Sequence, residues 1–326
     1  MLHDVDATTV ESSPGTLGRR RGAALLLAAV LTLASALTGC GTTPPAAPNG
    51  PSATPSPSVV PRATAEPLDA IGDLEAAYGA RVGAWVLDSG TGRVLEHRAD
   101  ERFAHASVVK LLLVGLLLRT AGDADLDAVI PIAADDVLAH APVTSRHVGS
   151  GLPLRDLMEA AMVVSDNTAA NLLVERLGGP AQVEAGLREL GNATTEVDRT
   201  EPTLNEARPG DPRDTSTPAG LGRTVERLVL GDALTPDRRD QLQRWLGANT
   251  TGDAAIRAGV PDGWTVGEKT GSGGYGTRND AGVVRPADGG PPVVVVLLTD
   301  RGVDGAASDD ALLADVTRAV VAQLGR

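Results

Sequence analysis

Residues 106–119 read ASVVKLLLVGLLLR, and this stretch decides the fold. Apart from Ser107, Lys110 and Arg119, every position is apolar or glycine, so the helix predicted here has almost no polar face. Such a helix has to lie in the middle of the protein, with other elements packed around it. Ser107 and Lys110 are three residues apart at its start and share one face, where the lysine amine can reach the serine hydroxyl.

Strand patterns lie at both ends of the chain, outside this helix. Toward the N-terminus, apolar residues at helical spacing predict a helix at residues 68–78, and residues 81–87 and 93–97 read as two strands joined by a turn. Toward the C-terminus we predict three strands and a closing helix, at residues 265–268, 281–284, 292–298 and 308–324.

Residues 120–250, in between, contain several helical segments and long loops with little strand pattern. Strands at both ends with helices between them indicate the α/β (α+β) class. We expect one antiparallel sheet built from both termini and flanked by helices, with an all-helical lobe inserted. A cleft between two such lobes is a common place for an active site.

Composition and charge exclude several classes of function. The 326 residues allow one or two domains, and the net charge of −13 argues against a nucleic-acid partner, because phosphate backbones bind clustered Lys and Arg. The single cysteine, Cys40, can form neither an intrachain disulfide nor a cysteine zinc site, and the five histidines lack tight ligand spacing. We therefore expect no metal and no cofactor.

The first forty residues read as an export signal. Arginines at residues 19–21 precede an apolar run at residues 23–37, which is too short to span a bilayer, since that takes about 20 residues. The run ends in Leu37-Thr38-Gly39-Cys40, which resembles the lipobox of bacterial lipoproteins, whose cysteine is acylated and becomes the new N-terminus. An ordinary signal peptide with an incidental cysteine is the alternative.

These features predict three segments and a location. Residues 1–39 are a lipoprotein signal peptide, residues 40–66 are the lipidated cysteine and a disordered Pro/Thr/Ala linker, and residues 67–326 are the folded domain. We expect an exported protein, anchored by lipid at the outer face of the cell membrane or free in the periplasm or medium. The lipid is its only expected membrane contact. The export route (Sec or twin-arginine) and the retention of the lipid stay open.

Three short motifs can carry chemistry, although each alone also fits a helix start or a turn. Ser107-Val108-Val109-Lys110 combines a nucleophile with an amine that acts as a base when it is desolvated. Ser165-Asp166-Asn167 adds a hydroxyl that can relay protons and an amide that can contact a substrate. Lys269-Thr270-Gly271 ends a predicted strand, and on an edge strand Lys and Thr can bind a carboxylate while glycine lets a ligand approach the backbone.

In this order the three motifs resemble the set shared by class A β-lactamases and penicillin-binding proteins. Between the second and third stands Glu201-Pro202-Thr203-Leu204-Asn205, which is similar to the omega loop of class A enzymes. Its glutamate is the feature that penicillin-binding proteins lack. From about residue 67 to residue 326 the chain therefore resembles a class A serine β-lactamase, in a lipoprotein form with an actinobacterial-like composition.

The resemblance implies hydrolysis of the amide bond of β-lactam antibiotics through a serine acyl-enzyme, which gives antibiotic resistance. Ser107 would attack the lactam carbonyl, and either Lys110 or Glu201 would be the base for that step. Ser165 would pass the proton to the lactam nitrogen. Glu201, together with Asn205, would activate the water that hydrolyses the acyl-enzyme.

The resemblance also implies a set of substrate contacts. Asn167 would contact the acylamido side chain, and Lys269, Thr270 and Arg278 would receive the substrate carboxylate. The backbone N–H groups of Ser107 and Ser272 would form the oxyanion hole, where each donor is typically worth about 3 kcal/mol. The omega loop would be closed by a pair between Arg199 and Asp214, and the peptide bond between Glu201 and Pro202 would be cis.

Two positions depart from the family pattern. Val108 follows the nucleophile where the family usually has Thr, and so a hydroxyl is lost there. His140 occupies the place of an aromatic wall residue, where it would contact the substrate as a smaller and titratable ring. The sequence does not specify which class of β-lactam is preferred or how inhibitors act.

Two other readings stay open beside the β-lactamase. One is a penicillin-binding DD-peptidase, which shares three motifs and lacks the equivalent of Glu201. The other is a lipoprotein that keeps the fold to bind peptidoglycan without catalysis. The expected partner is a small-molecule β-lactam, and a monomer is expected because the family is usually monomeric.

Overall fold

The computed structural model describes residues 65–326, so Cys40, the predicted signal peptide and most of the predicted linker lie outside the described residues. The sheet begins one residue earlier than predicted. Glu66, assigned to the linker, forms strand β1 (Glu66–Pro67) together with Pro67 and pairs with β3 (Val94–His97). The Arg93 guanidinium, 2.8 Å from the Glu66 carboxylate, ties this start to the sheet.

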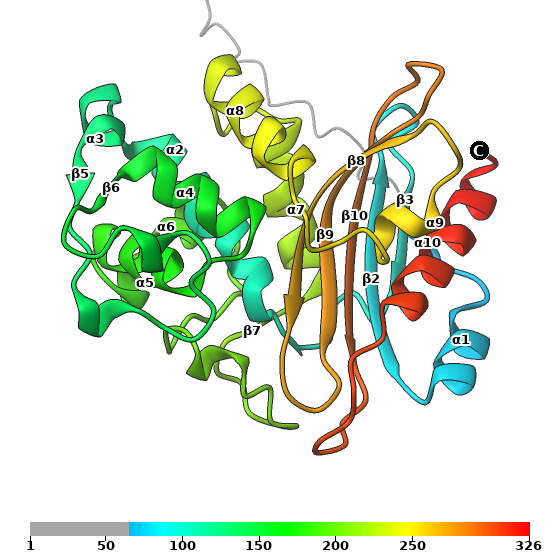
Figure 1. The fold of residues 1–326 in the computed structure, drawn as a ribbon. Helices are drawn as coiled ribbons and strands as arrows, with labels where there is room; N and C mark the ends of the chain where they lie inside the picture. The colour runs from blue at the N-terminus through cyan, green and yellow to red at the C-terminus, as the bar shows by residue number, and fades with distance from the viewer. Residues whose placement is uncertain (1–64) are drawn as a thin grey trace, which may run out of the picture. The chain divides into compact units, whose positions relative to one another are not determined.

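Within residues 65–326, strands from both ends of the chain form one six-stranded sheet in the order β1-β3-β2-β10-β9-β8 (Figure 1). Its long members are β2 (Arg81–Asp88), β8 (Thr265–Ser272), β9 (Arg278–Arg285) and β10 (Val293–Asp300). Every pairing is antiparallel except the two-residue β1 beside β3. The predicted fold class is therefore confirmed, with one short parallel edge added.

The C-terminal strands extend further than the sequence pattern suggested. We predicted that a strand ends at Glu268, but β8 continues through Lys269-Thr270-Gly271 to Ser272. The reason is the partner strand, because β9 begins at Arg278, directly opposite Ser272, and pairs along the whole length of β8. The third motif therefore lies on an edge strand, as predicted for Lys269 and Thr270, and the strand itself is longer than its local pattern indicated.

One face of the sheet carries the terminal helices. Alternate residues of β10 point to opposite faces, and Val293, Val295 and Leu297 join the core under α1 (Ile71–Tyr78), α9 (Ile256–Gly259) and α10 (Asp310–Leu324). Figure 1 shows α10 lying along this face, with α1 and α9 beside it.

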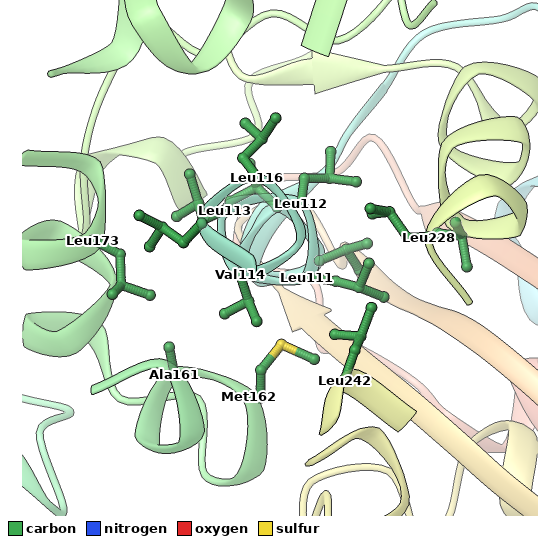
Figure 2. Packing of buried hydrophobic residues seen from close by; sticks show 14 of the residues in the cluster. Leu111, Leu112, Leu113, Val114, Leu116, Ala161, Met162, Leu173, Leu228 and Leu242 are labelled. Carbon is green, nitrogen blue, oxygen red and sulfur yellow. The ribbon is translucent and has the colours of Figure 1, made fainter. Parts of the chain in front are cut away.

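The other face meets the helical part of the chain, which is built around α2 (Val109–Thr120). Every residue of α2 from Val109 to Leu118 is buried, as the absence of a polar face predicts. Figure 2 shows Leu173, Ala161, Met162, Leu242 and Leu228 arranged around α2. The surrounding helices are α4 (Leu154–Val163), α5 (Asn167–Arg176), α6 (Pro180–Glu189), α7 (Pro218–Val229) and α8 (Pro236–Gly247).

Short elements complete this part of the chain. They are the 3₁₀ turns η1 (Ala106–Val108), η2 (Ala134–Asp136), η3 (Thr144–Arg146) and η4 (Thr203–Asn205), the helix α3 (Asp123–Asp127), and the strand pairs β4 (Phe103–Ala104) with β7 (Thr215–Ser216) and β5 (Val129–Ile130) with β6 (Leu152–Pro153). Among the helices of residues 65–326, none combines the length and the apolar character needed to cross a membrane.

The central position of α2 leads to a stability prediction. Leu112 is 0% exposed, so Leu112→Ala should lower the free energy of unfolding by about 2–5 kcal/mol, through lost transfer energy and the cavity left behind. Val303 is 61% exposed, and Val303→Ala should change the free energy of unfolding by less than about 0.5 kcal/mol. Denaturant titration of both variants measures the difference. Equal losses would contradict the buried position of α2.

Candidate active site

Ser107 lies in η1, the 3₁₀ turn that leads into α2, and is buried with 9% of its surface exposed. The residue before it, Ala106, has a φ of 46°, a left-handed conformation that non-glycine residues adopt only at a cost of about 1–3 kcal/mol. Strand β8 passes close by, because a Cβ added to Gly271 would lie 3.0 Å from the Ser107 backbone nitrogen. A side chain at Gly271 would crowd the backbone of residues 105–108, so Ser107 is set between a helix start and the edge strand.

The Lys110 side chain is completely buried one turn further along. Its Nζ donates hydrogen bonds to the Ser165 backbone oxygen at 2.8 Å and to Asn167 Oδ1 at 2.6 Å, and it lies 3.0 Å from Glu201 Oε1. Burial lowers the pKa of Lys110, and the charge and hydrogen bond of Glu201 oppose that shift. The amine thus joins the first and second motifs to the omega loop.

Among the described residues, Ser107 and Lys110 have no direct hydrogen bond, although the sequence places them on one face. Instead, the Ser107 hydroxyl donates to Glu201 Oε1 at 3.2 Å, the same oxygen that lies 3.0 Å from Lys110 Nζ. The carboxylate therefore links the serine to the lysine.

Ser165 lies between two lysines. Lys110 Nζ and Lys269 Nζ donate to its Oγ, at 3.2 and 3.0 Å respectively. Ser165 itself has a φ of 57°, so it is a second strained residue at this site. With both lone pairs of the hydroxyl oxygen occupied, its proton is free to be donated elsewhere.

Glu201 is held by its main chain as well as by its side chain. Asn171, on α5, donates from Nδ2 to the Glu201 backbone oxygen at 2.9 Å and accepts from the Glu201 N–H at 2.8 Å. Asn205, in η4, donates to Glu201 Oε2 at 2.5 Å, whereas its own Oδ1 is buried without a hydrogen-bond partner among the described residues. Asn171 was not among the residues predicted from the sequence.

The neck of the omega loop matches the expectation. Arg199 Nε lies 2.5 Å from Asp214 Oδ2, and the Arg199 guanidinium also contacts Glu206 at 2.9 Å. Asp214 is completely buried and accepts the backbone N–H groups of Asp198 and Arg199. The Glu201–Pro202 peptide bond is cis, as expected.

The residues expected to receive the substrate carboxylate lie on β8 and β9. Lys269 is completely buried, and its Nζ also donates to the Thr270 backbone oxygen at 2.7 Å. Burial, followed by the charge of Lys110, lowers the pKa of Lys269 well below its usual range. Thr270 Oγ1 shares a 2.5 Å hydrogen bond with Thr251 Oγ1. Arg278 donates to Ser272 Oγ at 2.9 Å.

Arg278 has two further partners that the sequence did not indicate. Its Nε donates to Asp310 Oδ1 at 2.6 Å, and its Nη2 donates to the Thr251 backbone oxygen at 2.9 Å. Nη2 also lies 2.6 Å from Asp310 Oδ1, so of the five N–H donors of the guanidinium the one that remains for a ligand carboxylate is on Nη1.

His140 lies at the exposed rim of the second motif. Its backbone oxygen accepts the Asn167 N–H at 2.8 Å, and its ring Nε2 is 3.0 Å from the Val164 backbone oxygen. Asp166 anchors the same segment, because its buried carboxylate accepts from the hydroxyl and backbone N–H of Thr144 and caps α5. The predicted residues of all three motifs, the omega loop and His140 are thus brought to one place.

No group of three or more His, Cys, Asp or Glu side chains in residues 65–326 is arranged to hold a metal ion. The ionisable groups at the site are two buried lysines and one buried glutamate, together with two serine hydroxyls. This set can transfer protons to and from an attacking hydroxyl.

Comparisons with known proteins agree with this geometry. Residues 66–324 match the model of the β-lactamase enzyme family. The chain belongs to that family. β-Lactamase AST-1 of Nocardia asteroides is 48% identical to it over 265 residues, covering 81% of this chain and 84% of the relative.

Solved β-lactamase structures match the fold as well. The β-lactamase of Streptomyces albus G superposes with a TM-score of 0.75 at 44% identity, covering 78% of this chain and 97% of the other. A mutant of the class A β-lactamase of the last common ancestor of Gram-negative bacteria gives 0.75 at 47%, with coverage of 78% and 97%. The fold and family predicted from the motifs are therefore confirmed, and the chain is a class A member of the β-lactamase family.

The clamp formed by Asn171 gives a testable prediction. Asn171→Leu removes both hydrogen bonds to the Glu201 main chain, and should lower the free energy of unfolding by about 1–3 kcal/mol. It should also speed amide hydrogen exchange at Glu201, as mass spectrometry of omega-loop peptides can measure. Asn171→Asp, which keeps the acceptor for the Glu201 N–H, should have the smaller effect on exchange. Unchanged exchange in Asn171→Leu would show that the loop is held by other contacts.

Proposed function

We propose that the protein hydrolyses β-lactam antibiotics through an acyl-enzyme at Ser107, and so confers resistance to them. The observation that carries this proposal is the meeting of Ser107 Oγ and Lys110 Nζ on one oxygen of a buried Glu201. A hydroxyl that donates to a carboxylate already has an acceptor for the proton it must lose when it attacks a carbonyl.

In the acylation step, Ser107 Oγ bonds to the lactam carbonyl carbon, the C–N bond breaks, and the lactam nitrogen takes up a proton. Glu201 is the proposed acceptor of the serine proton, because it is the group to which the hydroxyl donates. Ser165 is the proposed donor to the nitrogen, since two lysines occupy its oxygen and leave its proton free. The proton on Glu201 then returns to Ser165 through Lys110, whose Nζ lies 3.0 Å from Glu201 Oε1 and 3.2 Å from Ser165 Oγ, so that Glu201 is ionised again before deacylation. The lowered pKa of Lys110, caused by burial, fits the other candidate base, a neutral lysine.

In the deacylation step, a water molecule adds to the ester carbon and gives a proton to Glu201. The bond between that carbon and Ser107 Oγ then breaks, and Glu201 returns the proton to Ser107. Asn205 supports this role of Glu201. Its Nδ2 donates to one carboxylate oxygen while its buried Oδ1 is left as an acceptor that a water can satisfy. A general base that is lost typically costs about 10²–10⁴-fold in rate.

Substrate binding is proposed along β8. Lys269, Thr270 and the remaining Nη1 donor of Arg278 receive the carboxylate, and the backbone N–H groups of Ser107 and Ser272 form the oxyanion hole. Asn167 accepts from Lys110 through Oδ1, so its Nδ2 is available to the acylamido group, and His140 forms the adjoining rim.

We further propose an exported lipoprotein in which residues 1–39 are removed, Cys40 carries the lipid and the linker leads to a monomeric domain of residues 66–326. The sequence Leu37-Thr38-Gly39-Cys40 supports this. Cys40→Ala should move the protein from the membrane fraction to the soluble fraction of cells, as immunoblotting shows. If the variant stays in the membrane fraction, the anchor is not a lipid on Cys40.

The catalytic assignment is tested with Glu201→Gln and a chromogenic cephalosporin in a stopped-flow instrument. With Lys110 left as the base for acylation, the variant should still open about one equivalent of substrate per enzyme, and should then turn over about 10²–10⁴-fold more slowly than the native protein. Ser107→Ala, the matched control, should give no such burst. Rapid turnover by Glu201→Gln would refute the role of Glu201 in deacylation, and a burst with Ser107→Ala would refute the nucleophile.

The same experiment separates the remaining readings. A native protein that reacts once with the cephalosporin and then stops would behave as a penicillin-binding DD-peptidase. A native protein that neither reacts nor turns over, with penicillins as well as cephalosporins, would fit a lipoprotein that binds peptidoglycan without catalysis.

A further inference from the structure

A pair of acidic side chains, Glu268 and Asp280, lies buried under the carboxylate-binding strand, outside the catalytic groups described above. Both residues are 0% exposed. Glu268 is on β8, immediately before Lys269, and Asp280 is on β9, directly opposite Thr270. Because side chains alternate along a strand, both carboxyl groups point to the face under α9 and α10, whereas Lys269 points to the catalytic face.

Three of the four carboxyl oxygens of this pair lack a hydrogen-bond partner among the described residues. They are Oε1 and Oε2 of Glu268 and Oδ1 of Asp280. The fourth, Asp280 Oδ2, accepts the Ile256 N–H at 3.2 Å. Buried acceptors without donors are rare in proteins, and two adjacent carboxylates cannot both stay ionised away from water. A proton held between the two groups joins two of these oxygens and leaves one negative charge on the pair, while Glu268 Oε1 lies 3.1 Å from Arg257 Nη2.

The surroundings of the pair fit a single negative charge. Arg257 Nη2, on α9, lies 3.1 Å from Glu268 Oε1, but Arg257 also pairs with Asp253 at 3.3 Å. Gly252 packs against the same oxygen, where a Cβ would come within 2.3 Å. The other charged groups close enough to act on Asp280 are Arg278 and, from the opposite face of the sheet, Lys269. Burial and the charge of Asp280 raise the pKa of Glu268 far above its usual range.

Lys269 needs a counter-charge that lasts through the catalytic cycle. Its burial and the nearby Lys110 both favour the neutral amine, while Asp280 and then Glu201 favour the cation. In the proposed reaction Glu201 is protonated in each step, so its charge is lost just when substrate is bound. Asp280, on the far face of the sheet, takes no part in those transfers.

We propose that Glu268 and Asp280 share one proton, and that the single negative charge left on the pair keeps Lys269 protonated as the cation that receives the substrate carboxylate. The second half of this inference rests on the proposed function. Both residues are positioning residues, which act through Lys269 and do not touch the substrate.

The experiment compares three forms of the full protein: native, Glu268→Gln, and Glu268→Gln with Asp280→Asn. Both substitutions keep the shape of the side chain. The single variant removes the shared proton but leaves the charge on Asp280, and the double variant removes the charge. The measurement is kcat/KM across pH for benzylpenicillin, which carries a carboxylate, and for its methyl ester, which does not.

Native protein and Glu268→Gln should prefer the acid over the ester by the same factor. The double variant should lose about tenfold of that preference, and the alkaline limb of its pH profile should move down by about one pH unit. An unchanged preference and an unchanged limb in the double variant would overturn the role of the pair. An equal loss in Glu268→Gln would assign the effect to packing and not to charge.

Asp280→Asn alone is the second variant if the double variant does not fold. It moves the remaining charge toward Arg257, and the loss of acid preference should then be partial; no loss would count against the proposal.

Infrared spectroscopy tests the shared proton without turnover. The native protein at neutral pH should show a buried protonated-carboxyl band that Glu268→Gln lacks. If that band is missing in the native protein, the pair holds no proton, whether or not the protein hydrolyses β-lactams.

Discussion

The ion pair between Lys110 and Glu201, 3.0 Å apart with both side chains completely buried, is the constraint that the rest of the site satisfies. Removing two charges from water is expensive, and breaking such a buried pair by deleting one partner costs about 3–5 kcal/mol. The pair is therefore stable only where further donors and acceptors surround it. Asn205 and Ser107 satisfy the carboxylate, and Ser165 and Asn167 satisfy the amine.

The fold can be understood as the framework that holds this pair. The lysine comes from α2, a helix that is apolar on nearly every side, and so its backbone is fixed by packing from every direction. The glutamate comes from a loop, which would be mobile without ties. Asn171 on its main chain and the Arg199–Asp214 pair at its neck supply those ties. A rigid helix and a tethered loop thus meet at one carboxylate oxygen.

Much of this could be predicted from the sequence, for identifiable reasons. The strands and helices at the two ends of the chain follow from apolar periodicity, and burial of α2 follows from the absence of polar residues in 111–118. The residues of the proposed catalytic site could be singled out because they occur in short motifs of fixed order. The extension of β8 beyond Glu268 was not found, because the partner strand decides it and the local pattern does not.

The residues that were missed share one property, which is that their roles depend on contacts far along the chain. Asn171 hydrogen-bonds to Glu201, 30 positions away, and Asp310 accepts from Arg278, 32 positions away. Asp280 lies opposite Thr270 on the neighbouring strand β8. A lone Asn or Asp inside a helix or strand pattern carries no local sign of such a partner. Asp280 comes directly before the strand predicted at residues 281–284, so the local pattern did not mark it as buried.

The central claim is that the buried carboxylate of Glu201 accepts protons both when Ser107 is acylated and when water releases the acyl group. It is tested most directly by the intact mass of the native protein, followed over time with excess benzylpenicillin while product is measured in the same tube. The account predicts many equivalents of product per enzyme, with little penicillin bound once substrate is exhausted. A stoichiometric adduct that persists, with no product beyond it, would contradict the account, since it would mean that Ser107 reacts but Glu201 does not bring water to the ester.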